Sequence, residues 1–149
     1  MKALRQRLAA AHNAAERDDE GSILILTLGY ALLAIAVILV CVDATSLYLA
    51  QKRVDALADA AALAGADGFV LVVDDGEPRA ELTARDVRDQ AEAIIEAMDA
   101  DAVLVSADTP DSTSARVTVA STWHPPVMAL FVPDGVALQA TATSRTALR

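Results

Sequence analysis

The stretch that decides the fold is SILILTLGYALLAIAVILVCV, residues 22–42. It holds 21 residues without a charged side chain. At about 1.5 Å of rise per residue, a helix of this length crosses a hydrocarbon layer of about 30 Å. A secretory signal has an apolar core of only about 7–15 residues, and a buried helix of a soluble protein shows a polar stripe. Because this stretch is longer and apolar on every side, it predicts a transmembrane helix.

Basic residues on either side of this helix predict its direction. Four lie in residues 1–21, and two, Lys52 and Arg53, lie shortly after the helix. Loops rich in lysine and arginine stay on the cytoplasmic side of a membrane. We therefore expect a cytoplasmic leader at 1–21, a single transmembrane helix at 22–42, and the rest of the chain outside the cell.

The net charge of −9 comes entirely from the part after the membrane helix, which contains 17 acidic and 8 basic residues. An acidic exterior repels phosphate groups, so nucleic acid is not an expected partner. The only cysteine, Cys41, lies inside the apolar stretch, so the outer part must fold without a disulfide. Asp43 is the first charge after the membrane helix. A charge at the membrane rim is costly when unpaired, and this residue is therefore a candidate contact.

The helix is predicted to continue past Asp43 as an extracellular stalk over residues 43–66, because no proline occurs there and the first glycine is Gly65. Apolar and small residues recur at alternating intervals of three and four, the spacing of helices that pack along their length. They form a candidate packing seam of Leu47, Ala50, Val54, Leu57, Ala61, Ala64 and Gly65. The seam either packs on the chain's own outer domain or contacts another subunit, and the spacing leaves both possibilities open.

Residues 67–149 predict a small head domain that begins with a short apolar strand at 69–73. An amphipathic helix is expected from about 82 to 98, with Arg88 and Glu92 four residues apart on its polar face. This helix gives the head an apolar face that must be covered by another element.

Three later stretches alternate apolar and polar residues with the period of two that is typical of half-buried strands. They lie around residues 103–105, 117–119 and 136–142. The proline-rich stretch 123–135 is too rich in proline for a central strand and is expected to be a crossing loop. We therefore expect an α+β fold: a long N-terminal membrane-spanning helix, extended as a stalk, packs with the second amphipathic helix on a small antiparallel sheet of about three strands.

No pattern of catalytic residues is present. His12 and His124 lie on opposite sides of the predicted membrane helix, and the chain has no cysteine pair and no glycine-rich phosphate loop. Three acidic residues lack the alternating carboxylates of a calcium loop and fit a solvated turn: Asp74, Asp75 and Glu77. We expect no cofactor, no metal and no enzymatic activity.

Residues 20–66, EGSILILTLGYALLAIAVILVCVDATSLYLAQKRVDALADAAALAGA, closely resemble the N-terminal segment of TadG/TadE-like proteins of the Tad (Flp) pilus assembly system. The elements that carry the resemblance are Gly21, Asp43, Tyr48-Leu49-Ala50, Lys52-Arg53 and the segment 59–65. The resemblance implies a pilin-like minor or accessory subunit that acts by assembly through its N-terminal helix. It implies other pilus or Tad-system membrane subunits and the lipid bilayer as partners. The implied location is the cell membrane or a pilus on the cell surface.

The same resemblance implies cleavage by a prepilin peptidase between Gly21 and Ser22. Two features depart from a processed pilin: Leu26 stands where such a pilin has glutamate, and the leader ends in the acidic residues 18–20. A cleaved pilin-like subunit and an uncut, membrane-anchored accessory component therefore both stay open.

Two readings lie outside pilus assembly. In the first, the chain is a membrane-anchored extracellular binding module that enters no fibre, which predicts a pocket in the head. In the second, it is an anchored extracellular enzyme, for which the acidic turn offers the only candidate residues.

Overall fold

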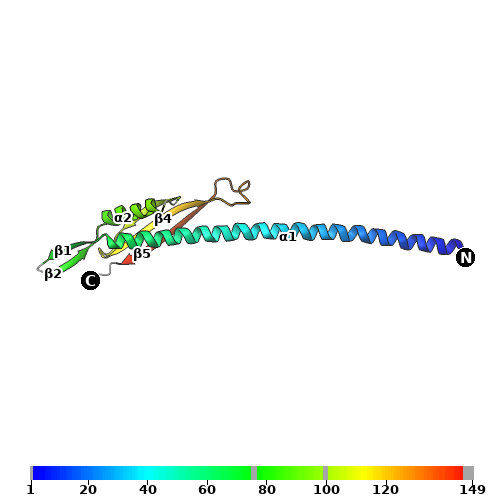
Figure 1. Cartoon of the computed structure of the whole chain (residues 1–149), viewed down its shortest axis with the longest axis horizontal. Coiled ribbons are helices and arrows are strands. Elements are labelled where there is room, and N and C mark those ends of the chain that lie inside the picture. The colour runs from blue at the N-terminus through cyan, green and yellow to red at the C-terminus, as the bar shows by residue number, and fades with distance from the viewer. Residues whose placement is uncertain (1, 75–76, 99–100, 146–149) are drawn as a thin grey trace. The chain divides into compact units, whose positions relative to one another are not determined.

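The computed structural model describes the backbone of residues 2–74, 77–98 and 101–145 and the side chains of residues 22–73, 81–98 and 101–145. The chain divides into two units, Met1–Val42 and Asp43–Arg149, each of which is described by itself. Seven elements follow in the order α1 (Lys2–Asp67), β1 (Val70–Asp74), β2 (Glu77–Glu81), α2 (Ala84–Ala97), β3 (Ala102–Asp108), β4 (Ser114–Trp123) and β5 (Val136–Arg145) (Figure 1). A long apolar helix, a second helix and a three-stranded antiparallel sheet confirm the expected α+β class.

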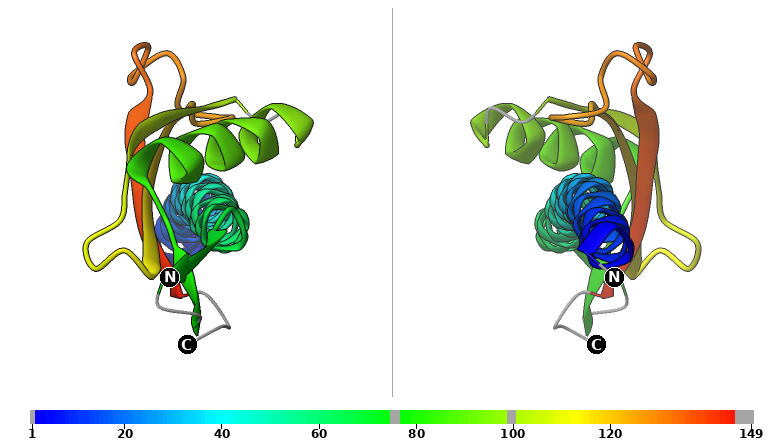
Figure 2. Two further views of the ribbon diagram at one scale, coloured as in Figure 1. Left: turned by 90° about the vertical axis from the view of Figure 1, so that its left-hand side faces the viewer. Right: turned by 90° about the vertical axis from the view of Figure 1, so that its right-hand side faces the viewer.

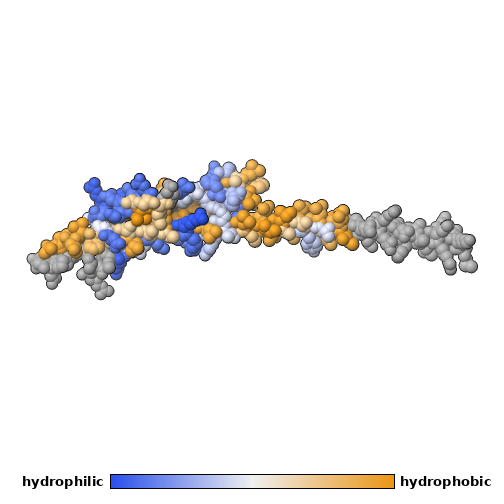
Figure 3. Space-filling view, viewed as in Figure 1, coloured by the Kyte–Doolittle hydropathy of each residue, from blue (hydrophilic) through white to orange (hydrophobic). Residues whose placement is uncertain are grey.

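The described side chains of the first unit lie on the helix α1, and all of them, from Ser22 to Val42, are exposed. The face visible in Figure 3 is predominantly apolar. A helix that exposes leucine, isoleucine and valine on all sides requires an apolar surrounding, because apolar surface in contact with water is unfavourable.

The second unit is built on the sheet β3-β4-β5, in which β4 is the central strand and both pairings are antiparallel. Its inner face carries Ala115, Val117 and Val119, which are fully buried. On the outer face, the hydroxyl groups of Thr118 and Thr141 lie 2.9 Å apart in a cross-strand hydrogen bond. The alternation of apolar and hydroxyl side chains along β4 therefore separates a covered face from a polar one.

Both helices of the second unit lie on the same face of this sheet, as the end-on views show (Figure 2). The helix α2 contributes Val87, Ala91 and Ile95 to the core. It is capped by Thr83, whose hydroxyl accepts a hydrogen bond from Asp86 N at 3.3 Å. The part of α1 in this unit contributes a mostly small apolar face: Val54, Leu57, Ala58, Ala61, Ala62 and Ala66. We call these six residues the α1 core face.

Gly65 of α1 lies in close contact with both α2 and β4. A Cβ atom at this position would lie 2.9 Å from Val87 Cγ1 and 3.3 Å from Ala115 Cβ. No room is therefore left for a larger side chain, and the glycine serves close packing rather than the end of the helix. The helix ends two residues later at Asp67, followed by a hydrogen bond from Gly68 N to Gly65 O of 3.3 Å.

A second, two-stranded sheet joins β1 and β2 in an antiparallel hairpin. The strand expected at 69–73 is found as β1, but its partner β2 was not predicted. The segment of β2 is charged and contains Pro78, which pairs with Val73 at the edge of the small sheet. Proline is tolerated in such an edge strand, because no further strand requires its missing N–H group.

The proline-rich stretch between β4 and β5 is a hairpin connection and does not cross the sheet. The two strands are direct neighbours, with Trp123 opposite Val136 at the first pair. The interpretation as a crossing loop was wrong because the proline content shows only that the stretch is no central strand. It does not tell which strands the stretch joins.

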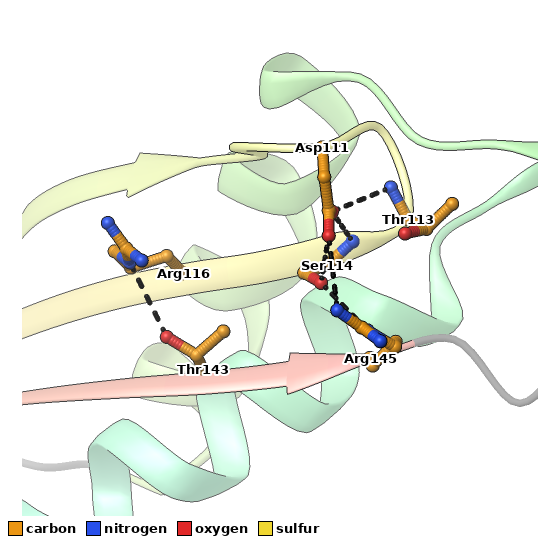
Figure 4. A network of polar contacts seen from close by, with 6 residues as sticks. All are labelled: Asp111, Thr113, Ser114, Arg116, Thr143 and Arg145. Atoms are coloured by element: carbon orange, nitrogen blue, oxygen red, sulfur yellow. Dashed lines mark hydrogen bonds and ion pairs between the residues drawn. The ribbon is translucent and has the colours of Figure 1, made fainter.

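Asp111 organises the connection between β3 and β4 (Figure 4). Its Oδ1 accepts hydrogen bonds from Thr113 N at 3.1 Å and from Ser114 N at 2.6 Å, and its Oδ2 accepts one from Ser114 Oγ at 2.9 Å. Arg145 Nη2, at the end of β5, lies 3.4 Å from Oδ2. Desolvation acts to raise the pKa of Asp111, but the bonds from Ser114 and Thr113 outweigh it and lower the pKa from 3.8 to about 2.

Replacing Gly65 by leucine is predicted to destabilise the head. The new side chain has to displace Val87 and Ala115, and overpacking of this kind costs about 1–3 kcal/mol or more. Asp59→Leu adds the same side chain to an exposed position of α1 and should change the stability by less than about 0.5 kcal/mol. Denaturation of the full chain in detergent, followed by the fluorescence of Trp123, measures both variants. Equal stability of the two variants would contradict the close approach at Gly65.

Asp111→Asn is predicted to lower the stability of the head at neutral pH, with the difference from the unmodified chain disappearing in acid. A carboxylate whose pKa is lowered by folding contributes stability above its unfolded pKa of 3.8, and this contribution is lost as the pH falls through about 2. Thermal unfolding monitored by Trp123 fluorescence at neutral pH, at pH 3.8 and near pH 2 measures the difference. A difference that is independent of pH would show that the charge of Asp111 does not matter.

Candidate functional site

The first candidate feature is the exposed apolar part of α1. The described part of this helix, beginning at Ser22, is long and apolar enough to cross a membrane, and its most apolar window is not buried in the protein. The bond between Gly21 and Ser22, where cleavage is predicted, lies within the bounds of α1. Cleavage there stays a prediction.

Asp43, predicted as a charge at the membrane rim, is the first residue of the second unit and is buried there, with 9% of its surface exposed. Its Oδ1 accepts a hydrogen bond from Val127 N at 3.1 Å, across 84 positions of sequence. Its Oδ2 has no hydrogen-bond partner among the residues that the structure describes. A buried carboxylate with a single partner is held there at an energetic cost, so this contact fixes one segment of chain against another.

The segment that Asp43 holds is the β4–β5 loop, which we define as residues 124–135. Trp123, just before the loop, adds a second link to α1, because its Nε1 donates to Ser46 Oγ at 3.1 Å. The tip of the loop is apolar and open to solvent: Leu130 is 88% exposed and Phe131 is 76% exposed. A loop was expected here, but its attachment to α1 was not predicted from the sequence, since no local pattern reports a contact between distant segments.

The predicted packing seam lies against the chain's own core. Val54, Leu57, Ala61 and Gly65 are buried, whereas the remaining three seam residues are partly buried: Leu47, Ala50 and Ala64. This geometry corresponds to the intramolecular alternative. The strict spacing of three and four omitted part of the α1 core face, namely Ala58, Ala62 and Ala66. A repeat of four between these alanines was the signal for a wider buried stripe.

The face of α1 that points away from the head's core remains open for contacts with other molecules. Tyr48 is 61% exposed, Leu49 50% and Leu63 57%. Between them, Lys52 Nζ bonds to Asp55 Oδ2 at 2.9 Å and lies 5.9 Å from the centre of the Tyr48 ring. The hydrogen bond to Asp55 and its charge raise the pKa of Lys52, which therefore stays positively charged. Exposed apolar residues beside a fixed charge suit a contact between helices better than the buried seam does.

A cavity of about 600 Å³ opens between α1 and the ends of β3, β4 and β5. Three of its lining residues have ionisable side chains: Arg53, Asp101 and His124. The remaining lining is mixed: Ala50, Val54, Ala56, Leu57, Met98, Ala102, Ser121, Thr122, Trp123 and Leu138. The volume suits a small molecule or a side chain of another protein.

Metal-binding geometry is not found among the described residues, which contain no group of three His, Cys, Asp or Glu side chains able to hold an ion. His124 lies at the cavity, and Cys41 is exposed on the apolar part of α1. Of the acidic turn, Asp75 lies outside the described residues, and the side chains of Asp74 and Glu77 are not described. The side chain of His12 is not described either.

Asp43→Ala is predicted to release the β4–β5 loop without unfolding the head. A hydrogen bond to a charged group contributes about 1.5–3 kcal/mol, so exchange of the Val127 amide hydrogen should accelerate about tenfold or more. Asp43→Asn keeps an oxygen acceptor in place and should preserve most of the protection. Hydrogen exchange of the full chain in lipid nanodiscs measures the Val127 amide. Unchanged exchange in Asp43→Ala would show that this contact does not hold the loop.

Comparison with known proteins yields a match, and it lies on the helix α1. No curated protein and no solved structure matches the chain. A family model does match, and it covers the apolar part of α1 together with the part that packs into the head, ending at the glycine that follows the helix. Residues 21–68, about a third of the chain, match the family described as "Putative Flp pilus-assembly TadE/G-like", which confirms the resemblance for this segment.

Proposed function

We propose that this chain is a pilin-like minor or accessory subunit of a Tad/Flp-type pilus assembly system, anchored in the membrane and acting by assembly through α1. One observation carries the proposal. The segment that matches the family is a single helix that supplies both the apolar membrane anchor and the α1 core face of the head. The family match by itself supports a role related to pilus assembly, and the apolar helix supports anchoring in a membrane.

In this proposal the leader 1–21 is cytoplasmic and the head is extracellular, as the basic residues before the anchor favour. The head's acidic surface and its lack of cysteine agree with a domain that folds by packing alone outside the cell. Neighbouring subunits then contact the exposed residues of α1 in the head, such as Leu49 and Leu63.

The proposed role is structural and does not require catalysis. Contacts made by a long helix are extended apolar surfaces, and their strength comes from buried area rather than from a reactive group. The buried seam positions Ala61 and Gly65 are not suitable for testing such contacts, because bulky residues there disrupt the head itself.

The cavity beside α1 favours one alternative, a membrane-anchored extracellular binding module that enters no fibre. Such a module needs a pocket of about 300–1,000 Å³ with a few polar groups, and the cavity of about 600 Å³ with Arg53, Asp101 and His124 falls in this range. The two functions differ in their relation to the fibre. A pilus subunit is found in the fibre and an accessory subunit is needed for its assembly, whereas a binding module is neither.

In its pilin-like form, the proposal predicts that the chain is recovered with sheared surface fibres and that Leu63→Asp removes it from them. The substitution places a charge on an exposed, apolar site of α1, so the head stays folded while a helix contact is lost. Val72→Asp makes the same change at an exposed position of β1 and should leave recovery unchanged. The measurement is immunodetection in fibre and membrane fractions, with the head's folding checked by Trp123 fluorescence.

The N-terminal residue of the recovered protein separates the remaining forms of the proposal. Ser22 at the N-terminus in the fibre fraction identifies a cleaved pilin-like subunit. An intact Met1 found only in membranes, together with loss of fibres when the chain is deleted, identifies an anchored accessory component. Absence from fibres together with normal fibre assembly in the deletion strain would overturn the proposal in favour of the binding module.

A further inference from the structure

The most exposed large apolar side chains of the described residues are not in the membrane anchor but at the tip of the β4–β5 loop. Leu130 is 88% exposed and Phe131 is 76% exposed, and Val127 and Met128 are 41% and 40% exposed. We call these four residues the loop tip. No charged residue occurs between Pro125 and Pro133, so the tip is a continuous apolar projection, visible in orange in Figure 3. An exposed apolar projection of this kind is typical of a surface that contacts a membrane or another protein.

The fold does not need this projection to join its strands. Neighbouring antiparallel strands are commonly connected by two to five residues, whereas this loop uses residues 124–135. The additional residues form a defined turn. Phe131 N and Val132 N both donate to Met128 O, at 2.9 and 3.2 Å, and Gly135 N donates to Val132 O at 3.2 Å. Gly135 has a φ of +71°, a conformation that glycine adopts without strain. The loop therefore presents its apolar tip in a fixed shape.

Two hydrogen bonds hold the loop at the residues of α1 that directly follow the membrane anchor. Val127 N donates to Asp43, and Trp123 Nε1 donates to Ser46. Asp43 is the first charged residue after the 21 uncharged ones, and it is bonded through the backbone to Val42. Where the anchor spans the hydrocarbon layer, Asp43 lies at the level of the lipid headgroups, and Val127 lies there with it.

From this level the loop tip can reach the lipid. The turn closed at Met128 O keeps Met128 and Phe131 within about 7 Å, so Phe131 lies up to about 11 Å from Val127. The headgroup layer on each side of a bilayer is about 5–8 Å thick. Trp123, which is partly buried and hydrogen-bonded at the base of the loop, has the amphipathic ring that is enriched at membrane interfaces.

From these contacts we infer that the β4–β5 loop inserts its tip into the membrane leaflet adjacent to Asp43, as a second membrane contact in addition to the chain's own anchor. The inference rests on the proposed anchoring by residues 22–42, but it does not depend on which side of the membrane the head occupies. The occupant is lipid rather than protein because the loop is attached to the residues that border the anchor. Asp43 and Asp134 flank the tip, so the insertion is driven by apolar side chains and requires no anionic lipid.

Site-specific probes in the full chain test this inference. Cys41 is the only cysteine, so Cys41→Ser provides a background in which Phe131→Cys, Val73→Cys and Leu33→Cys are each labelled with an environment-sensitive fluorophore. Val73 is 69% exposed on β1 and serves as the control in the head, and Leu33 serves as the control in the anchor. The proteins are placed in phosphatidylcholine nanodiscs with and without a spin-labelled lipid that quenches the fluorophore.

The expected result is a blue-shifted emission and quenching by the labelled lipid at positions 131 and 33, and neither effect at position 73. Adding Asp43→Ala to the position-131 protein should reduce its quenching, since the loop then loses its hydrogen bond to residue 43. Water-like emission at position 131 with quenching at position 33 overturns the inference and leaves the anchoring intact. A blue shift at position 131 without lipid quenching also overturns it, because the tip then contacts protein. Water-like emission at position 33 contradicts the proposed anchoring itself.

Discussion

The packing of small side chains on α1 against β4 and α2 is the contact on which the rest of the second unit depends. The α1 core face consists mainly of alanine, and Gly65 extends it where Val87 and Ala115 approach. Small residues allow a helix to lie close to a sheet, so that many weak dispersion contacts replace the few large ones that aromatic residues would provide. With aromatic residues at only 3% of the chain, close approach is how this head obtains a dense core.

This arrangement ties the family-matched segment to the head. One part of this helix is an exposed apolar segment and another part is a buried core element, so removal of the whole matched segment would also remove the α1 core face from the head. The match to residues 21–68 ends beside the last contact of α1 with the core, so the matched segment includes everything that this helix contributes. The remaining strands and α2 complete the other half of the same core.

The regular elements could be predicted because their physics is local. Hydrophobic periodicity indicated α2 and the three strands, and the ion pair between Arg88 and Glu92 is found at 3.8 Å. The strand β2 was not predicted because its segment is charged and contains Pro78. It becomes a strand only through its pairing with β1, in which Val73 lies opposite Pro78. The hydrogen bond between Asp43 and Val127 was not predicted for a related reason. It joins residues 84 positions apart, and the sequence around neither residue indicates the other as its partner. The candidate interaction surfaces depend on such distant contacts, so the sequence indicated the apolar helix and a loop at 123–135 but not the contacts between that loop and α1.

The order of the elements has a consequence for synthesis. The α1 core face emerges from the ribosome first, whereas β4, which covers it, follows some fifty residues later. During this interval, among the described residues, α2 is the only helix that can cover part of the alanine-rich stripe, and the three-stranded sheet cannot complete its own core without that stripe. Folding of the head therefore lags behind synthesis of α1, because part of the stripe stays uncovered until the strands of the three-stranded sheet have been made.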